Sequence, residues 1–474
     1  MTIEWRLAVA PPRDADAVAL PAYAGEPPDL AAPAFLAGCG FHAAAGQILQ
    51  LPGDPPTVLV GLGPRDGLDQ DAVRTAAAML ARSVRGYRRL AIRVPAPGWV
   101  RAVVEAFTLG GYRFTRYKSE PGPAGPARVD LIVESTVDAE DGLRIGRALA
   151  AGVRLARDLV NETGDALTPA GFADRAAVIA RTGGLDCEIW DEHRIAAERL
   201  GGLAGVARGS PRPPRLVELT YRPERPAATV ALVGKGVTYD AGGLSLKPTA
   251  QLVDMAADMA GAATVLGAMA VLAELRCPVR VRGWLPLTEN MLGTDPIRVG
   301  DVLRIRDGTT VEVRNADAEG RLILADALVL AAESAPDAII DVATLTDAAA
   351  IALGRRIGAV LGNDPDWVDT VRAAATRAGE RLWPLPLPDC YRPQLDSRIA
   401  DLVNYTTGNR HGTALLAGLF LREFVPGTIP WAHLDIQGTA LSDGDAGEWV
   451  PGATGFGVRT LAELLLTPSG FAPR

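Results

Sequence analysis

The sequence contains very little lysine. Of its 48 basic side chains only three are Lys, at positions 118, 235 and 247, and the other 45 are Arg. A chain with this bias uses Arg wherever positive charge alone is needed, so two lysines in one short motif indicate a requirement that Arg does not meet. An amine can lose its proton when desolvated or beside a cation and can then bind a metal, whereas a guanidinium cannot. Solvated surface lysines are the alternative, but the residues around Lys235 and Lys247 are mostly apolar or Gly.

Cysteine, excess positive charge and long apolar runs are also lacking. The four cysteines have no CxxC spacing, which indicates free thiols in a reducing compartment and excludes a zinc–thiolate site. The net charge of −8 offers no basic footprint, so we expect no nucleic-acid partner. The N-terminus has no secretory signal, and the most apolar run, residues 259–273, is too short to span a bilayer. We therefore expect a cytoplasmic protein that does not enter membranes.

The length and the apolar content predict two domains. With 474 residues, 48% of them apolar, the chain exceeds one ordinary domain. Strand patterns alternate with helical patterns, which is typical of α/β folds with parallel or mixed sheets. We expect a smaller N-terminal α/β domain over residues 1–141, a linking helix over 142–164, and a larger α/β catalytic domain with a central mixed sheet over 165–474.

Hydrophobic periodicity predicts the individual elements. In the N-terminal domain the expected strands are residues 57–63, 88–95 and 129–135, with helices over 71–85 and 98–109. In the catalytic domain the expected strands are residues 187–190, 216–221, 228–233, 279–287, 338–342 and 431–436. Its expected helices are residues 256–275, 320–334, 367–378 and 412–424.

Carboxylates gather in two stretches, VGKGVTYDAGGLSLKPTAQLVDMAADM (residues 233–259) and NADAEGRLILADAL (residues 315–328). Asp240 ends an apolar run, at the place where α/β folds have their ligand crevice. Asp317, Glu319 and Arg321 are spaced i, i+2, i+4, so in an extended chain their side chains would point the same way. Asp326 lies two helical turns beyond Glu319 and is interpreted as helix charge or support. We expect the two stretches to meet.

Four carboxylates in one crevice require a cation, or most of them would be protonated. The candidates are Asp240, Asp258, Asp317 and Glu319. Two carboxylates about 4 Å apart repel by about 4 kcal/mol at an effective dielectric constant near 20. Oxygen donors with one amine suit Zn, Mn, Mg or Co. The sequence has no HExxH motif and no histidine pair at ligand spacing, which favours a carboxylate-bridged site for two divalent metal ions.

These stretches resemble those of the leucyl aminopeptidases, the cytosol aminopeptidase family of two-metal exopeptidases. The similarity covers nearly all of the C-terminal two-thirds. It also includes VNETGDALTPAGFA, GLAGVARGSPRPPRLVELTY, DVATLT and WAHLDIQGTA. The N-terminal third is less similar, and in the family this domain resembles macro domains.

The resemblance implies a ligand for each metal ion. Asp240 and Glu319 would bridge the two ions. Lys235 and Asp258 would complete the shell of one ion, and Asp317 would complete the shell of the other. In the family either Zn or Mn supports activity, and the members are typically homohexamers.

The resemblance also implies a mechanism. A metal-bound water or hydroxide would attack the peptide carbonyl, and protonated Lys247 would stabilise the developing oxyanion. Arg321 would hold a bicarbonate-like anion that serves as the general base. The substrate would be a peptide with a free N-terminus, because its α-amine would bind a metal.

The sequence departs from the family pattern near the pocket for the substrate's first side chain. That pocket would contain Met255, Asp347 and Gln437, and the family has Gly and Ala where this chain has Asp347 and Gln437. We expect a more polar or narrower pocket that accepts a basic or small polar N-terminal residue. The alternative is that both side chains point away and specificity is unchanged.

Two other functions are open on the residues alone. Some members of the family also bind DNA, so a DNA-binding or regulatory hexamer is one alternative, although the charge of −8 argues against it. Another two-metal hydrolase, such as a phosphatase or an amidase, is the second, because metal-binding carboxylates do not specify the substrate.

Overall fold

The computed structural model describes residues 3–26, 30–408 and 411–467. The chain divides into two compact units. The first unit comprises Met1–Arg154 with Ser442–Gly452, and the second comprises Leu155–Leu441 with Ala453–Arg474. Searched over the described ranges, none of the helices combines the length and the apolar character that crossing a bilayer requires.

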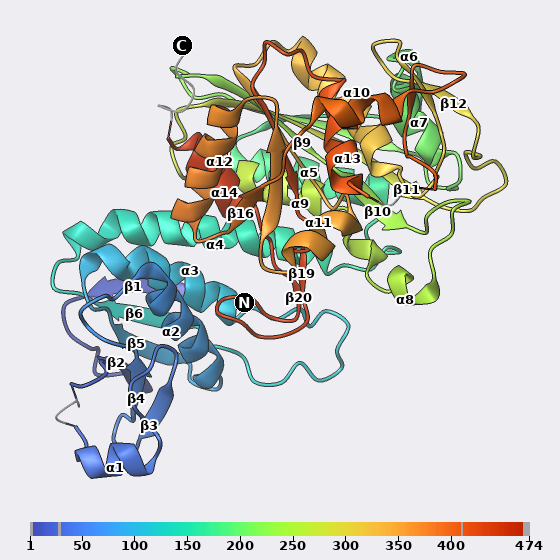
Figure 1. Ribbon diagram of the computed structural model, residues 1–474. Coiled ribbons are helices and arrows are strands. Elements are labelled where there is room, and N and C mark those ends of the chain that lie inside the picture. The colour runs from blue at the N-terminus through green and yellow to red at the C-terminus, as the bar shows by residue number, and fades with distance from the viewer. Residues whose placement is uncertain (1–2, 27–29, 409–410, 468–474) are drawn as a thin grey trace. The chain divides into compact units, whose positions relative to one another are not determined.

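The first unit contains a six-stranded sheet in the order β1-β6-β5-β2-β4-β3 (Figure 1). All neighbouring strands are parallel except β3, which is antiparallel to β4. The strands are β1 (Glu4–Ala8), β2 (Ala17–Ala22), β3 (Ile48–Leu51), β4 (Thr57–Gly61), β5 (Arg89–Arg93) and β6 (Arg128–Ile132). The helices are α1 (Pro33–Gly38), α2 (Gln70–Ser83) and α3 (Val100–Gly110), and the apolar sides of α2 and α3 share one core with β4, β5 and β6.

A segment from near the C-terminus completes the first unit. Residues 442–452 form most of a hairpin whose stem strands are β19 (Leu441–Ser442) and β20 (Gly452–Ala453). Arg74 of α2 is buried and bridges Glu105 of α3 at 2.7 Å and Glu448 of this segment at 2.9 Å. The guanidinium of Arg82 also donates to the carbonyls of Gly447 and Trp449, at 2.7 and 2.8 Å.

The second unit is built on a nine-stranded mixed sheet in the order β16-β15-β18-β14-β9-β11-β8-β7, with β10 beside β11. The four strands β18, β14, β9 and β11 run parallel, and β10 is parallel to β11. The strands are β7 (Asp186–Trp190), β8 (Arg215–Tyr221), β9 (Thr229–Gly234), β10 (Gly236–Asp240), β11 (Arg280–Asn290), β14 (Ala338–Ala343), β15 (Gly358–Gly362), β16 (Leu382–Pro384) and β18 (Trp431–Asp435). A small sheet contains β12 (Val302–Arg304), β13 (Thr310–Glu312) and β17 (Leu402–Val403). The predicted two-domain α/β class with a mixed central sheet is confirmed.

Helices of the second unit pack on this sheet in groups. The helix α10 packs with α7 and α13, and α9 packs with α14, which in turn contacts α12. The bounds are α4 (Glu140–Val160), which crosses the division between the units, α5 (Pro169–Gly183), α6 (Glu192–Ala197), α7 (Gly201–Ala207), α8 (Thr249–Leu252), α9 (Ala260–Met269), α10 (Gly320–Glu333), α11 (Asp347–Leu353), α12 (Pro365–Ala378), α13 (Thr413–Arg422) and α14 (Val458–Leu465). The helix predicted over residues 256–275 is shorter, because a 3-10 turn (Met255–Ala257) precedes it.

Candidate metal centre and its pocket

Parallel strands bring the candidate residues to one edge of the sheet. Lys235 directly follows β9, Asp240 ends β10, and Thr344 directly follows β14. Because β9, β14 and β11 are parallel, and β10 runs parallel to β11, the carboxyl ends of all four strands lie at the same edge. This edge is where open α/β sheets bind their ligands.

The carboxylates of Asp240, Asp317 and Glu319 converge at this edge. One oxygen from each lies within 4.8 Å of the others. Asp240 and Glu319 are 2% and 1% exposed, so water screens their repulsion weakly. The two stretches predicted to meet therefore do meet.

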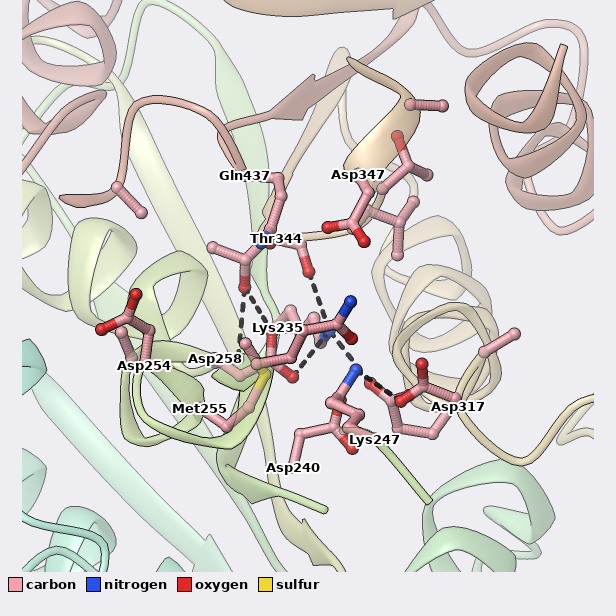
Figure 2. A pocket seen from close by; sticks show the side chains of 18 of the residues that line it. Lys235, Asp240, Lys247, Asp254, Met255, Asp258, Asp317, Thr344, Asp347 and Gln437 are labelled. Carbon is pink, nitrogen blue, oxygen red and sulfur yellow. Dashed lines mark hydrogen bonds and ion pairs between the residues drawn. The ribbon is translucent and has the colours of Figure 1, made fainter. Parts of the chain in front are cut away.

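Both lysines of the motif reach into this cluster (Figure 2). The amine of Lys235 donates to Asp258 Oδ1 at 2.9 Å and to the Thr344 carbonyl at 2.8 Å, and it lies 3.0 Å from Glu319 Oε1. The amine of Lys247 lies 2.9 Å from Asp240 Oδ2 and forms an ion pair with Asp317. Neither lysine is a solvated surface residue, since their side chains are 4% and 12% exposed.

Two asparagines fix the loops that carry the acids. Asn290 ends β11, pairs with Asp240 across the sheet, and donates from Nδ2 to Asp240 Oδ1 at 2.8 Å and to the Ala316 carbonyl at 3.0 Å. Asn404 donates to the Asn315 carbonyl at 2.7 Å and the Ala318 carbonyl at 3.2 Å. Sequence reasoning missed both residues. The only available signal was an amide side chain at the end of an apolar strand.

The backbone around Glu319 differs from the expected extended chain. Glu319 is already in the helical region, with φ −77° and ψ −35°, and α10 begins at the next residue. The prediction that Asp317, Glu319 and Arg321 point the same way from an extended chain is therefore wrong. A turn followed by the start of a helix brings Asp317 and Glu319 together. Gly320 is needed for close approach, because a Cβ atom there would lie 2.6 Å from Lys235 Cε and 2.8 Å from its Nζ.

Burial and mutual repulsion shift the acids toward their protonated forms. Burial, followed by the charges of Asp240 and Glu319, raises the pKa of Asp317 to about 7, against the opposing effect of Lys247. The pKa values of Asp258 and Glu319 are also raised, with burial as the main cause. Burial would lower the pKa of Lys235, but Asp258, Glu319 and Asp240 outweigh it and raise this pKa. A divalent cation among the same groups would act in the opposite direction on each of them.

The donor set fits divalent metal ions. Glu319 Oε2 is buried and has no hydrogen-bond partner among the described residues. Asp258 Oδ2 and Asp317 Oδ1 are likewise without a hydrogen bond of good geometry there, and each has only a lysine amine close by. Buried carboxylate oxygens turned toward one another are costly unless a cation joins them. The five predicted metal ligands, Lys235, Asp240, Asp258, Asp317 and Glu319, all line one cavity.

Arg321 faces the same cavity with an unused donor. It is 4% exposed, and its Nη1 donates to the Asn404 carbonyl at 2.8 Å, while its Nε has no hydrogen-bond partner in the described part of the chain. Burial lowers the pKa of Arg321 to about 10, so the guanidinium stays charged at neutral pH. A buried cation with a free N–H suits a small anion.

The cavity has a volume of about 800 Å³ and also contains the predicted pocket residues. Met255, Asp347 and Gln437 all line it, and Figure 2 shows Asp347 and Gln437 together on one side of the lysine–carboxylate cluster. Asp347 is exposed and is the first residue of α11, and Gln437 follows the end of β18. Asp254 and Tyr405 line the cavity as well and were not singled out from the sequence.

Asp326 lies outside the cavity. It is fully buried and accepts hydrogen bonds from the backbone N–H groups of Leu203 at 2.9 Å and Arg306 at 3.0 Å. It therefore supports the packing of α7 and the loop after β12 against α10, so of the two interpretations, helix charge or support, the contacts favour support.

Comparisons with known proteins agree with this geometry. The model of the cytosol aminopeptidase family, catalytic domain, matches residues 154–462, and that of the N-terminal domain matches residues 30–121. The chain is 47% identical over 424 residues to a "Probable cytosol aminopeptidase" of Leifsonia xyli subsp. xyli, covering 86% of this chain and 84% of that protein. It is 44% identical over 420 residues to one of Mycobacterium tuberculosis strain H37Rv, covering 86% and 81%. The solved structure of bottromycin maturation enzyme BotP in complex with Mn has a TM-score of 0.88 and 44% identity, and the match covers 95% of this chain and 99% of that one.

Proposed function

Since the chain belongs to the cytosol aminopeptidase family and is thus a metal-dependent, leucyl aminopeptidase-type hydrolase of peptides, we propose that it uses two metal ions to release N-terminal residues. The observation that carries this proposal is the convergence of Asp240, Asp317 and Glu319 within 4.8 Å, beside the amine of Lys235. Mn or Zn is the proposed metal, because oxygen donors with one nitrogen suit both ions.

Each ligand has a proposed place. Asp240 and Glu319 would serve both ions, since the charges of these two carboxylates act on Lys235 and on Lys247 alike. Lys235 and Asp258 would hold one ion, and Asp317 would hold the other. When bound, two such ions polarise a carbonyl group and make water a strong nucleophile at neutral pH.

Lys247 and Arg321 act on charge that develops during the reaction. Burial would lower the pKa of Lys247, but Asp240, Glu319 and Asp317 raise it, and Lys247, unlike Lys235, is not a proposed metal ligand, so it is the amine proposed to keep its proton. A protonated amine at the mouth of the cluster can donate to the oxyanion of the tetrahedral intermediate. Arg321 would hold a bicarbonate-like anion through its free Nε–H, and this anion would supply the general base.

The pocket for the N-terminal side chain is proposed to be polar. Asp347 and Gln437 both line the cavity, and Met255 contributes an apolar surface. A carboxylate and an amide in this place favour a basic or small polar N-terminal residue over leucine. Comparing kcat/KM for Arg-, Leu- and Gly-terminated dipeptides tests this, with Asp347→Gly as the variant. A preference for leucine that Asp347→Gly leaves unchanged would refute it.

One experiment tests the whole assignment. Purified protein is analysed for bound metal and assayed with an amino-acid anilide and with its N-acetylated form. We expect two Mn or Zn ions per chain and hydrolysis of the free anilide only. Hydrolysis of both substrates, or of a phosphate ester instead, would identify another two-metal hydrolase.

Assembly and location are parts of the same proposal. We propose a homohexamer in the cytoplasm, in line with the cytosol aminopeptidase names of the relatives. Sedimentation velocity gives the oligomeric state. Retention on DNA that falls steeply with salt would instead support a DNA-binding role.

A further inference from the structure

A single buried carboxylate joins the two loops that bear Asp347 and Gln437. Asp435, the last residue of β18, is 2% exposed. Its Oδ1 accepts hydrogen bonds from the backbone N–H groups of Leu345 and Gln437, both at 3.2 Å. Its Oδ2 accepts a hydrogen bond from the Thr346 hydroxyl at 2.6 Å. Because a buried carboxylate is costly to desolvate, satisfying it with donors from two loops ties both loops to it.

Thr346 extends this connection to Asp347. Its hydroxyl donates to Asp435 and also accepts from the backbone N–H of Ala349 at 3.1 Å, as the N-cap of α11. Asp347 is the first residue of that helix, so the position of its side chain follows from the cap. Gln437 is held more directly, through its own N–H.

The other end of the same loop is tied to the metal centre. Thr344 donates from its hydroxyl to Asp258 Oδ1 at 2.7 Å, and its carbonyl accepts from Lys235 at 2.8 Å. Residues 344–346 thus span from the proposed metal ligands to Asp435. Residues 344–346 are bonded to the metal-ligand cluster at one end and to Asp435 at the other. This segment therefore sets the distance between the cluster and the side of the pocket that contains Asp347 and Gln437.

We propose that Asp435 is a positioning residue for substrate selection, which fixes Asp347 and Gln437 relative to each other and to the metal centre. This inference rests on the proposed function, because it concerns selection of the N-terminal side chain. Asp435 is not among the residues that line the cavity, so it acts on a substrate there only through other residues. Its effect reaches the substrate through Thr346 and Gln437.

The test uses three variants and a matched control. Asp435→Asn retains one acceptor oxygen and loses at least one of the three bonds, and Thr346→Val removes the hydroxyl, whereas Thr346→Ser keeps it. Glu380→Gln is the control. Glu380 is also buried and accepts from the Gly457 N–H, the Thr460 N–H and the Thr460 hydroxyl at 3.0, 3.0 and 2.6 Å, but it lies outside the cavity.

Two measurements decide the outcome. We expect the ratio of kcat/KM for Arg- and Leu-terminated dipeptides to move about tenfold toward one in Asp435→Asn and Thr346→Val, and to stay at the wild-type value in Thr346→Ser and Glu380→Gln. We also expect amide hydrogen exchange of residues 345–349 and 437–440 to be about tenfold faster in the first two variants only. Exchange in Asp435→Asn that is no faster than in Glu380→Gln overturns the inference. A wild-type protein without peptidase activity overturns the proposed function instead, and the exchange measurement still decides the role of Asp435.

Discussion

Replacing Lys235 by Arg distinguishes two roles of this residue, that of a metal ligand and that of a positive charge that only stabilises the fold. The Lys235 amine is buried among Asp258, Glu319 and the Thr344 carbonyl, and its chain lies against Gly320, where even a methyl group would approach within 2.6 Å. A guanidinium keeps the charge but has no lone pair to give and needs more room. We therefore expect Lys235→Arg to hold one metal ion per chain in place of two, and to lose activity.

The size of the effect follows from linkage. Each metal site that binds only the folded chain adds about 2.7 kcal/mol to the free energy of unfolding when the metal concentration is 100 times its Kd. Saturation should thus stabilise the wild type by about 5.4 kcal/mol and Lys235→Arg by about half as much. A second variant, Lys235→Met, removes the charge as well. In metal-free buffer its free energy of unfolding should fall by about 3–5 kcal/mol, because one partner of a buried ion pair is missing.

The assay combines metal analysis with thermal or denaturant unfolding, with and without excess Mn. Lys118→Arg is the matched control, since Lys118 is exposed and is the third lysine of the chain. It should leave metal content, stability and activity at wild-type values. Two ions per chain and normal turnover in Lys235→Arg would refute the ligand assignment.

Three further variants give distinct results. Glu319→Ala should abolish activity and leave the fold intact, because Glu319 is the ligand proposed to serve both ions; retained turnover would contradict that proposal. Gly320→Ala should lower metal content and activity, because its Cβ atom would lie 2.8 Å from Lys235 Nζ; metal titration checks this. Burial raises the pKa of Asp326 to about 7, well above its ordinary value, so its contribution to stability is present below about pH 4 and is lost as the pH rises through 7. Asp326→Asn should therefore lose less stability than the wild type between pH 5 and pH 8, as measured by urea unfolding at both.

The sequence predicted which residues form the site better than it predicted how they are arranged. The scarcity of lysine marked Lys235 and Lys247, and the strand end at Asp240 marked the edge of the sheet, because these signals are local. The convergence of Asp240 with Glu319 is not a local property, because the two residues lie in stretches that are distant along the chain. The roles assigned to these residues in catalysis stay predictions.

Other contacts left no local trace in the sequence. Asn290, Asn404 and Asp435 each form hydrogen bonds to loops that are distant along the chain. The residues next to them in the sequence do not indicate these partners. Three strands of the first unit, β1, β2 and β3, were also missed. The alternation of polar and apolar residues in β1 (EWRLA) is a strand pattern that the prediction overlooked. β2 is apolar throughout and contains Pro21, and β3 has only four residues, so neither has a clear strand pattern. The Ala-rich run after Asp258 reads as helix to residue 275, but the helix ends at Met269 and Arg276 adopts φ 55° before Pro278.

The late hairpin also limits how this protein can be divided. Glu448 and the carbonyls of Gly447 and Trp449 interact with two arginines, Arg74 and Arg82, that lie in the first 154 residues of the chain. A fragment beginning after Arg154 would contain Glu448 and the two carbonyls without their arginine partners. A fragment ending at Arg154 would contain Arg74 and Glu105 without Glu448. A single cut in the gene therefore removes ion pairs and hydrogen bonds from both fragments. Expressing the second unit alone also requires shortening the hairpin.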